Sequence, residues 1–300
     1  MRGGSVFERC VVVGGAGAVG RMFSHWLVRS GVAVTWLDLD AAGAGAGGVD
    51  GVRVVAGDVR RPGPEAVAVL AAADVVVLAV PEPVAWEAVE VLAPVMRPGA
   101  VLADTLSVKS RIAGRLRRAA PGLQAVGLNP MFAPSLGLQG RPVAAAVVTD
   151  GPGVRALVEL VAQWGARVVE MPAEQHDALT AVQQAATHAA VLAFGLGLGE
   201  LSADVGALRD SAPPPHLAML ALLARIAGGT PEVYFDIQAA NPGAPAARQA
   251  LGRGLVRLGQ AVEAGDEETF EALFAELRGV LGEHGAPLEE LCARMFTALR

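Results

Sequence analysis

Three glycines near the start of the chain have the spacing of a phosphate-binding loop. Gly15, Gly17 and Gly20 form the pattern G-x-G-x-x-G within "VVVGGAGAVG". In a dinucleotide-binding fold, the first glycine makes a tight turn, the second admits a pyrophosphate, and the third lets helix and strand pack closely. Asp38 ends the next apolar run, where its carboxylate can accept hydrogen bonds from ribose hydroxyls and would repel a 2′-phosphate. The pattern therefore predicts an NAD site.

A second group of polar residues recurs at every fourth position. His176, Thr180, Gln184 and His188 lie in a segment that is otherwise rich in Ala, Val and Leu. On a helix this spacing makes a slowly drifting polar stripe. The apolar residues around it predict a buried helix, and buried polar groups need partners. The stripe therefore meets another chain, lines a cleft between domains, or consists of core histidines with ordinary hydrogen bonds.

The first part of the chain alternates strand and helix patterns. Short runs rich in Val, such as "RCVVVGG" and "DVVVLAVP", have the composition of strands that are buried on both faces. Helical segments such as "AVGRMFSHWLVRSG" separate them. This alternation predicts an α/β Rossmann-type domain with a parallel sheet over residues 1–172. The strand runs cover residues 9–15, 32–40, 52–58, 74–81, 100–107, 122–130, 142–150 and the end of 151–172.

After residue 172 the strand pattern stops. Residues 174–200, 203–227, 230–240 and 245–300 are helical in pattern, with breaks at "SAPPPH" and "NPGAP". We therefore expect a second, all-helical domain over residues 173–300. The Gly/Ala-rich segment 41–48 is expected to be a flexible loop.

Composition excludes several classes of partner and site. A net charge of −6 argues against nucleic acid, which binds to basic surfaces. Cys10 and Cys292 are the two cysteines, which is too few for a disulfide framework, and their surroundings lack zinc-ligand spacing. We expect both to be buried and no metal to be bound. The N-terminal residues lack the apolar core of a signal peptide, and long uninterrupted apolar runs are absent, so we expect a cytoplasmic protein without membrane contact.

Several motifs together resemble the prephenate dehydrogenase family. "VVVGGAGAVGRMF", "DTLSVKS", "GLNPMFAPSLG", "EQHDALTAVQQAATHAAVLAFGLGL" and "LLARIAGGTPEVYFDI" occur in the family's order and spacing, over about residues 9–275. The resemblance implies a dinucleotide-binding domain followed by a helical domain that forms a homodimer. It also implies an NAD-dependent oxidative decarboxylation, in which a hydride leaves C4 of a cyclohexadiene dicarboxylate, CO2 leaves C1 and the ring becomes aromatic.

The resemblance assigns roles residue by residue. Ser107 matches a serine near the C4 substituent, and Arg225 matches an arginine that binds a substrate carboxylate, for which a buried guanidinium is well suited. Tyr234, the only tyrosine, matches a tyrosine of the same region. The expected catalytic residues are Ser107, Asn129 and His188, the expected substrate-binding residues are His176, Gln184, Arg225 and Tyr234, and the expected cofactor-binding residues are Gly15, Gly17, Ala18, Val19, Gly20, Asp38 and Pro81.

Asn129 departs from the family pattern at the catalytic position. The family has His-Pro-Met-Phe where this chain has Asn-Pro-Met-Phe. In the family, that histidine interacts with the 4-hydroxyl of prephenate and accepts its proton. An amide cannot accept a proton near neutral pH, and loss of a general base typically lowers a rate by about 10²–10⁴-fold. Ala133 also replaces a family glycine in this motif, which suggests a reshaped pocket.

Three interpretations of Asn129 remain. The substrate can carry an amino group at C4, as in 4-amino-4-deoxyprephenate, because the nitrogen lone pair expels the hydride unaided. Relatives of this kind make 4-aminophenylpyruvate on pathways to 4-aminophenylalanine and antibiotics built from it. Alternatively, the enzyme uses prephenate or arogenate, with His176, His188 or water as proton acceptor. In the third interpretation, the chain is a binding or regulatory relative with little catalysis. We favour the amino substrate.

A different class of dehydrogenase also joins a nucleotide-binding domain to a helical one. Dehydrogenases of this class act on β-hydroxyacids or imines and usually rely on a lysine in the first long helix of the second domain. Residues 174–200 contain no lysine, and the only lysine in the chain, Lys109, lies in the first domain. The sequence therefore argues against this class.

Overall fold

The computed structural model describes residues 6–39 and 49–299 and divides the chain into two compact units. The first unit is Met1–Thr180 and the second is Ala181–Arg300. The flexible loop expected over residues 41–48 lies outside the described residues.

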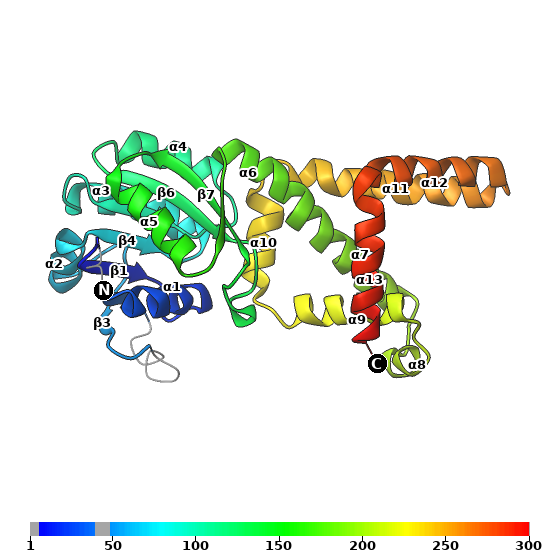
Figure 1. Ribbon diagram of the computed structural model, residues 1–300, viewed down its shortest axis with the longest axis horizontal. Coiled ribbons are helices and arrows are strands. Elements are labelled where there is room, and N and C mark those ends of the chain that lie inside the picture. Colours follow the sequence, from blue (N-terminus) through cyan, green and yellow to red (C-terminus); the bar gives the residue numbers. More distant parts are fainter. Residues whose placement is uncertain (1–5, 40–48, 300) are drawn as a thin grey trace. The chain divides into compact units, whose positions relative to one another are not determined.

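An eight-stranded sheet forms the centre of the first unit (Figure 1). The strand order β3-β2-β1-β4-β5-β6 is that of a dinucleotide-binding fold, and β7 and β8 extend it. Successive strands are added on one side of β1 up to β3 and on its other side from β4 onward. The strands are β1 (Arg9–Val13), β2 (Ala33–Asp38), β3 (Arg53–Ala56), β4 (Val75–Leu78), β5 (Val101–Asp104), β6 (Gln124–Pro130), β7 (Pro142–Thr149) and β8 (Arg167–Glu170).

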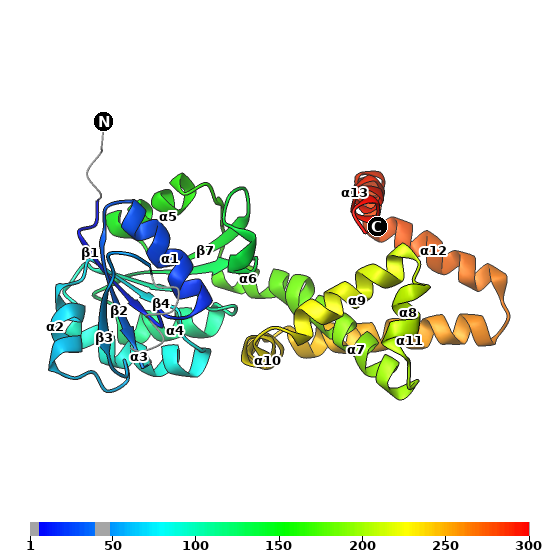
Figure 2. The same cartoon turned by 90° about the horizontal axis from the view of Figure 1, so that it is seen from below.

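Helices cover both faces of the sheet (Figure 2). On one face, α1 (Ala18–Arg29) and α5 (Pro152–Gln163) pack through residues such as Phe23 and Leu157 against alternate strand residues. On the other face, α2 (Pro64–Ala72), α3 (Glu82–Val95) and α4 (Ser110–Ala119) pack through residues such as Leu70 and Leu92. Because both faces are covered, β4 and β5 are buried along their whole length.

The first unit ends with α6 (Ala173–Thr180), which contacts α4 and β7. Asp177 at the middle of α6 accepts hydrogen bonds from the backbone N–H groups of Lys109 and Ser110, each at 2.8 Å, at the start of α4. A helix start leaves such N–H groups without intrahelical partners, so a carboxylate distant in sequence caps α4.

The second unit is entirely helical among its described residues. It contains a π-helical turn η3 (Ala181–Ala186), α7 (Thr187–Glu200), α8 (Val205–Asp210), α9 (Pro214–Ala227), α10 (Pro231–Ala240), α11 (Ala244–Glu263), α12 (Glu267–Leu281) and α13 (Gly285–Thr297). Two 3-10 turns are also present: η4 (Gly282–His284) in this unit and η2 (Pro134–Leu136) in the first unit. Asp204 and Asp266 cap α8 and α12 by accepting backbone N–H bonds.

The structure corrects three expectations about the fold. The sheet is not wholly parallel, because β6 and β7 pair antiparallel. The domain boundary expected after residue 172 stays a prediction, and the first compact unit extends past it to include α6. Cys10 is buried as expected, but Cys292 is exposed, because α13 has no buried residue. The helix over residues 174–200 is not largely buried, since Val191 is the single buried residue of α7.

One helical segment, Ala173–Glu200, is long and apolar enough to cross a membrane by length and composition alone. Its first part is α6, whose His176, Asp177 and Thr180 are buried within the first unit. Only 17% of its most apolar window is buried in this single chain. We interpret the remaining apolar surface as a protein contact.

Candidate active site

The site residues of the first unit follow the ends of parallel strands. The glycine loop follows β1, Asp38 ends β2, Pro81 follows β4, Ser107 follows β5, and Asn129 lies near the end of β6. These strands are parallel to one another, so their carboxyl ends lie at one edge of the sheet. Ligands of open α/β sheets bind at this edge, where the strand order reverses.

The glycine loop leaves no room for side chains at its turns. A Cβ atom on Gly20 would lie 2.2 Å from the carbonyl oxygen of Gly14, and one on Gly15 would lie 2.2 Å from Cγ of Trp36. The left-handed residue of the loop is Gly14, with φ +78°, not Gly15. The tight turn expected at Gly15 is therefore made one residue earlier, and Gly15 instead gives room to Trp36.

Asp38 already contributes to the loop's shape. Its Oδ2 accepts a hydrogen bond of 2.9 Å from the backbone N–H of Ala16. Gly17 lies at the start of α1 and donates its N–H to the carbonyl of Gly14 at 3.1 Å. The carboxylate that is expected to bind the ribose thus also ties the end of β2 to the glycine loop.

Pro81 and Ser107 lie on loops after neighbouring strands. Pro81 is exposed and immediately precedes α3. Ser107 is half-buried in the connection from β5 to α4. Thr105, just before it, donates its hydroxyl to the carbonyl of Leu78 at 3.1 Å, which ties the start of this connection to the end of β4.

Asn129 lies in a buried polar network. Its side chain is 2% exposed, and Nδ2 lies 3.0 Å from Nε2 of His176 and 3.3 Å from Sδ of Met131. Nδ1 of His176 lies 2.9 Å from Oδ1 of Asp177. Burial disfavours ionisation of Asp177, but hydrogen bonds from His176, Ser110 and the backbone outweigh this effect and hold its pKa below the usual value of 3.8.

Lys109 is a further buried residue at this edge that sequence reasoning missed. Its ammonium lies 2.5 Å from Oδ1 of Asp104, and both side chains are 1% exposed. Burial lowers the pKa of Lys109, and the carboxylates of Asp104 and Asp177 oppose that shift. Gly127 makes room for the lysine, since a Cβ there would lie 2.6 Å from Cδ of Lys109. The sequence could not reveal that Gly127 lies against Lys109, because this contact depends on the pairing of β5 with β6.

The helical unit brings together three of its predicted site residues. The rings of His188 on α7 and Tyr234 on α10 are 5.0 Å apart and nearly perpendicular. Burial lowers the pKa of His188 below 6.5, and the positive charge of Arg225 on α9 lowers it further. Nδ1 of His188 is buried without a hydrogen-bond partner among the described residues. Arg225, expected to be buried, is exposed in this single chain.

The polar stripe is divided between the units. His176 and Thr180 are buried in the first unit, whereas Gln184 and His188 belong to the second. Gln184 lies in the π-helical turn η3, one turn before His188. A π-helical turn changes the four-residue register of a helix and is frequent at functional sites. The sequence pattern carried no sign of this change.

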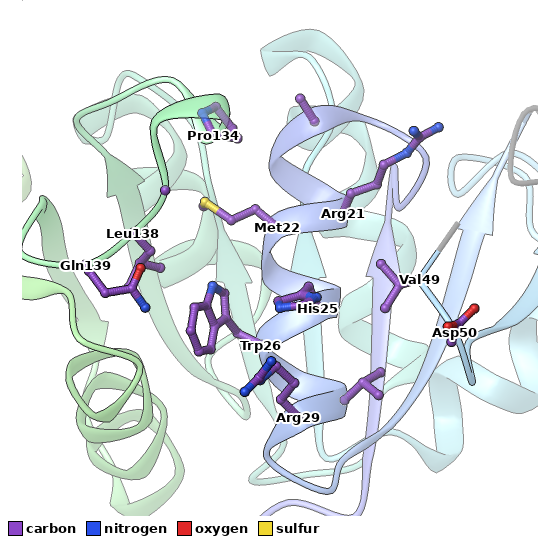
Figure 3. Close-up of a pocket in the computed structure, with 13 residues that line it drawn as sticks. Arg21, Met22, His25, Trp26, Arg29, Val49, Asp50, Pro134, Leu138 and Gln139 are labelled. Carbon is purple, nitrogen blue, oxygen red and sulfur yellow. The ribbon is translucent and has the colours of Figure 1, made fainter. Parts of the chain in front are cut away.

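A separate cavity of about 700 Å³ lies along α1 (Figure 3). Met22 and Trp26 of α1 face Leu138 and Gln139 across it. Of the predicted cofactor residues, its lining includes Ala18 alone. Neither Asn129 nor His176 lines it, so the cavity is distinct from the polar network around Asn129.

Comparisons with known proteins agree with this arrangement. Residues 43–170 match the prephenate dehydrogenase nucleotide-binding domain, and residues 172–276 match the prephenate dehydrogenase dimerization domain. The chain is 93% identical to 4-amino-4-deoxyprephenate dehydrogenase of Streptomyces pristinaespiralis over 100% of both chains. It is 30% identical to the T-protein of Enterobacter agglomerans, covering 91% of this chain and 68% of that protein.

Solved structures with low sequence identity share the fold. Prephenate dehydrogenase from A. aeolicus, in complex with hydroxyphenyl propionate and NAD+, superposes with a TM-score of 0.73 at 19% identity, covering 90% of this chain and 96% of that one. Synechocystis arogenate dehydrogenase gives a TM-score of 0.66 at 18% identity, with 90% and 98% covered. The family matches and the near-identical relative lead to one conclusion: this chain belongs to the prephenate dehydrogenase family.

Proposed function

We propose that this enzyme oxidatively decarboxylates 4-amino-4-deoxyprephenate to 4-aminophenylpyruvate with NAD. The observation that carries the proposal is Asn129, which stands where the family has its catalytic histidine. The 93% identical Streptomyces protein bears the name of this activity. The product is a precursor of 4-aminophenylalanine, an antibiotic building block. We expect the reaction to take place in the cytoplasm.

The glycine loop fits a dinucleotide. Among the described residues, no side chain caps the start of α1, and its first turn contains no acidic residue. The backbone N–H groups at this helix start are therefore available to an anion. Gly15, Gly17, Ala18, Val19 and Gly20 would hold the pyrophosphate, Asp38 the adenosine ribose, and Pro81 would lie beside the nicotinamide ribose. Bound NAD supplies the acceptor for the hydride that leaves the substrate. Residues 1–172 thus form the cofactor domain.

The helical domain, residues 173–300, supplies the substrate contacts. Arg225 forms no ion pair within the described residues, which leaves its guanidinium available for a bidentate bond to a substrate carboxylate. Tyr234 and Gln184 complete the substrate contacts. His188 stays neutral near pH 7, because both burial and Arg225 disfavour its protonation. A neutral imidazole can accept or donate a hydrogen bond without repelling Arg225.

The chemistry at C4 needs no proton acceptor when the substituent is an amine. As the C4–H bond breaks, the nitrogen lone pair stabilises the developing cation, and loss of CO2 from C1 then supplies the electron pair that makes the ring aromatic. The amine keeps both protons throughout. Asn129 Oδ1 can accept one of these N–H bonds, which strengthens as nitrogen becomes positive. An interaction that is stronger in the transition state raises the rate.

Prephenate or arogenate is the alternative substrate. Such a substrate needs a proton acceptor, and the basic side chain beside Asn129 is His176, whose Nε2 lies 3.0 Å from Asn129 Nδ2. Both of its ring nitrogens already have hydrogen-bond partners, and the side chain is 1% exposed. These contacts favour the amino substrate, because a base must reach the proton that it accepts.

The enzyme is expected to work as a homodimer. Its second half matches a dimerization domain. An apolar groove of about 560 Å³ between η3 and α11 is lined by Val182, Leu251, Leu255 and Leu258. These residues are between 39% and 72% exposed in the single chain, which is unusual for a contiguous apolar surface unless another protein covers it. A second copy is the occupant we propose.

Replacement of Asn129 by His tests the assignment. With a base restored, Asn129→His should raise kcat/KM for prephenate by at least about 10²-fold, the lower limit for general-base catalysis. Turnover of 4-amino-4-deoxyprephenate should fall, because the imidazole does not reproduce the amide acceptor. Asn129→Asp is the matched control, since it keeps the shape but adds charge. An unchanged preference in Asn129→His would contradict the proposed role of this position.

A further inference from the structure

The Asn129 amide is the last member of a buried hydrogen-bonded chain. The order is Asp177, then His176, then Asn129, joined by contacts of 2.9 Å and 3.0 Å. All three side chains are 2% exposed or less. Buried polar groups of this kind hold fixed orientations, because breaking any one bond leaves a buried group without a partner.

Asp177 determines which nitrogen of His176 carries the proton. An ionised carboxylate only accepts hydrogen bonds, so the ring nitrogen that faces Asp177 Oδ1 must donate. That nitrogen is Nδ1. Asp177 is itself held by the N–H groups of Lys109 and Ser110 at 2.8 Å and by the Ser110 hydroxyl. In a neutral imidazole with its proton on Nδ1, Nε2 is left as an acceptor.

The orientation of Asn129 follows from this tautomer. Nε2 of His176 can accept only from the amide nitrogen Nδ2, whose other N–H points to the Met131 thioether at 3.3 Å. Both amide protons are thereby used. The carbonyl oxygen Oδ1 has no hydrogen bond within the described residues and is the one group of the amide left for a ligand.

We propose that His176 and Asp177 are positioning residues that lock Asn129 with its carbonyl oxygen presented to the substrate amine. The inference rests on the proposed function. If the amide turned over, its NH2 group would donate to the lone pair of the amine. A lone pair held in a hydrogen bond cannot stabilise the cation that forms as the hydride leaves. The lock therefore keeps the lone pair free for the reaction, and His176 acts without touching the substrate.

The kinetic test compares two replacements of His176. Phe keeps the ring but offers no acceptor, whereas Gln can place a carbonyl oxygen near the position of Nε2. His176→Phe should lower kcat for 4-amino-4-deoxyprephenate about tenfold, the effect of one misdirected hydrogen bond, with a smaller change in KM. His176→Gln should retain most of the activity. Equal losses in both variants, or an unchanged kcat in His176→Phe, would overturn the positioning role.

The tautomer can be measured without any substrate. In the full-length protein labelled with ¹⁵N-histidine, the His176 signals are identified by their loss in His176→Gln. The lock requires a protonated Nδ1 and an unprotonated Nε2, and a proton on Nε2 would overturn it even if His176→Phe fails to fold. Failure of the proposed function looks different, because an enzyme that turns over prephenate alone while showing the Nδ1 tautomer would refute the substrate and leave the lock intact.

Discussion

At the residue scale, the chemistry open to each polar side chain depends on the groups that surround it. The motif "GLNPMF" indicated that Asn129 replaces a base, and the hydrogen bonds to His176 and Met131 explain what the amide can do instead. Sequence spacing placed His176 among the substrate contacts, but it could not show that a neighbouring aspartate and an asparagine 47 positions earlier occupy both ring nitrogens.

Arg225 and His188 provide a residue-scale prediction. The Arg225 charge contributes to the lowered pKa of His188, so Arg225→Gln should raise that pKa toward 6.5 and increase the protonated fraction at pH 6. An NMR titration of the imidazole measures it. The same variant should raise KM for the substrate by about 10–100-fold, as expected for a lost charged hydrogen bond.

Arg209 offers the matched control for this titration. It lies on α8, pairs with Asp210 at 3.2 Å, and does not contribute to the His188 pKa shift. Arg209→Gln should leave both the His188 titration and KM unchanged. A His188 pKa that does not move in Arg225→Gln would show that the two side chains are farther apart in solution than in this structure.

At the element scale, the sequence predicted the positions of the strands better than their directions in the sheet. Short apolar runs identified all eight strands of the described sheet, and β4, which is buried on both faces, is apolar throughout. The direction of β7 was missed. Only the short turn η2 occurs between β6 and β7, and a parallel return crossing needs a dozen or more residues, usually a helix. The length of this connection is therefore the sequence feature that predicts antiparallel pairing of β6 and β7.

The glycine loop gives the element-scale prediction. Gly20→Ala should destabilise the first unit by about 1–3 kcal/mol and weaken NAD binding, because its Cβ would overlap the Gly14 carbonyl. Gly252→Ala is the control within a helix, since a Cβ there meets nothing within 4 Å and Gly252 does not line the apolar groove. It should stabilise α11 by about 0.5–1 kcal/mol through higher helix propensity. Chemical denaturation and NAD titration measure both variants, and a Gly20→Ala protein with normal NAD affinity would contradict the close packing.

At the scale of the whole molecule, the exposed apolar side chains of the helical unit are the main feature that one chain leaves unexplained. Composition predicted a buried helix over residues 174–200, yet Leu196 there is 72% exposed. Beyond that helix, Leu201 and Leu255 are 80% and 72% exposed. An apolar sequence pattern predicts that a helix is buried, but it does not show whether the atoms that cover the helix belong to the same chain. Both Cys292 and Arg225, expected to be buried, are exposed in this single chain.

The dimer prediction addresses this surface directly. Leu255→Glu should shift the protein from dimer to monomer in light scattering after size exclusion, because a charge in an apolar interface is costly to desolvate. Gln249→Glu adds the same charge to α11 outside the groove and should remain dimeric. If Leu255→Glu stays dimeric at low micromolar concentration, the groove is not the contact between copies.

We propose that nitrogen at substrate C4 removes the need for a base at the position of Asn129. The most direct measurement is kcat/KM of the unmodified protein with NAD for 4-amino-4-deoxyprephenate, prephenate and arogenate, followed by NADH absorbance. We predict that the amino compound exceeds the other two by about 10²-fold or more, the range of a missing general base. Faster turnover of prephenate or arogenate than of 4-amino-4-deoxyprephenate would contradict the account.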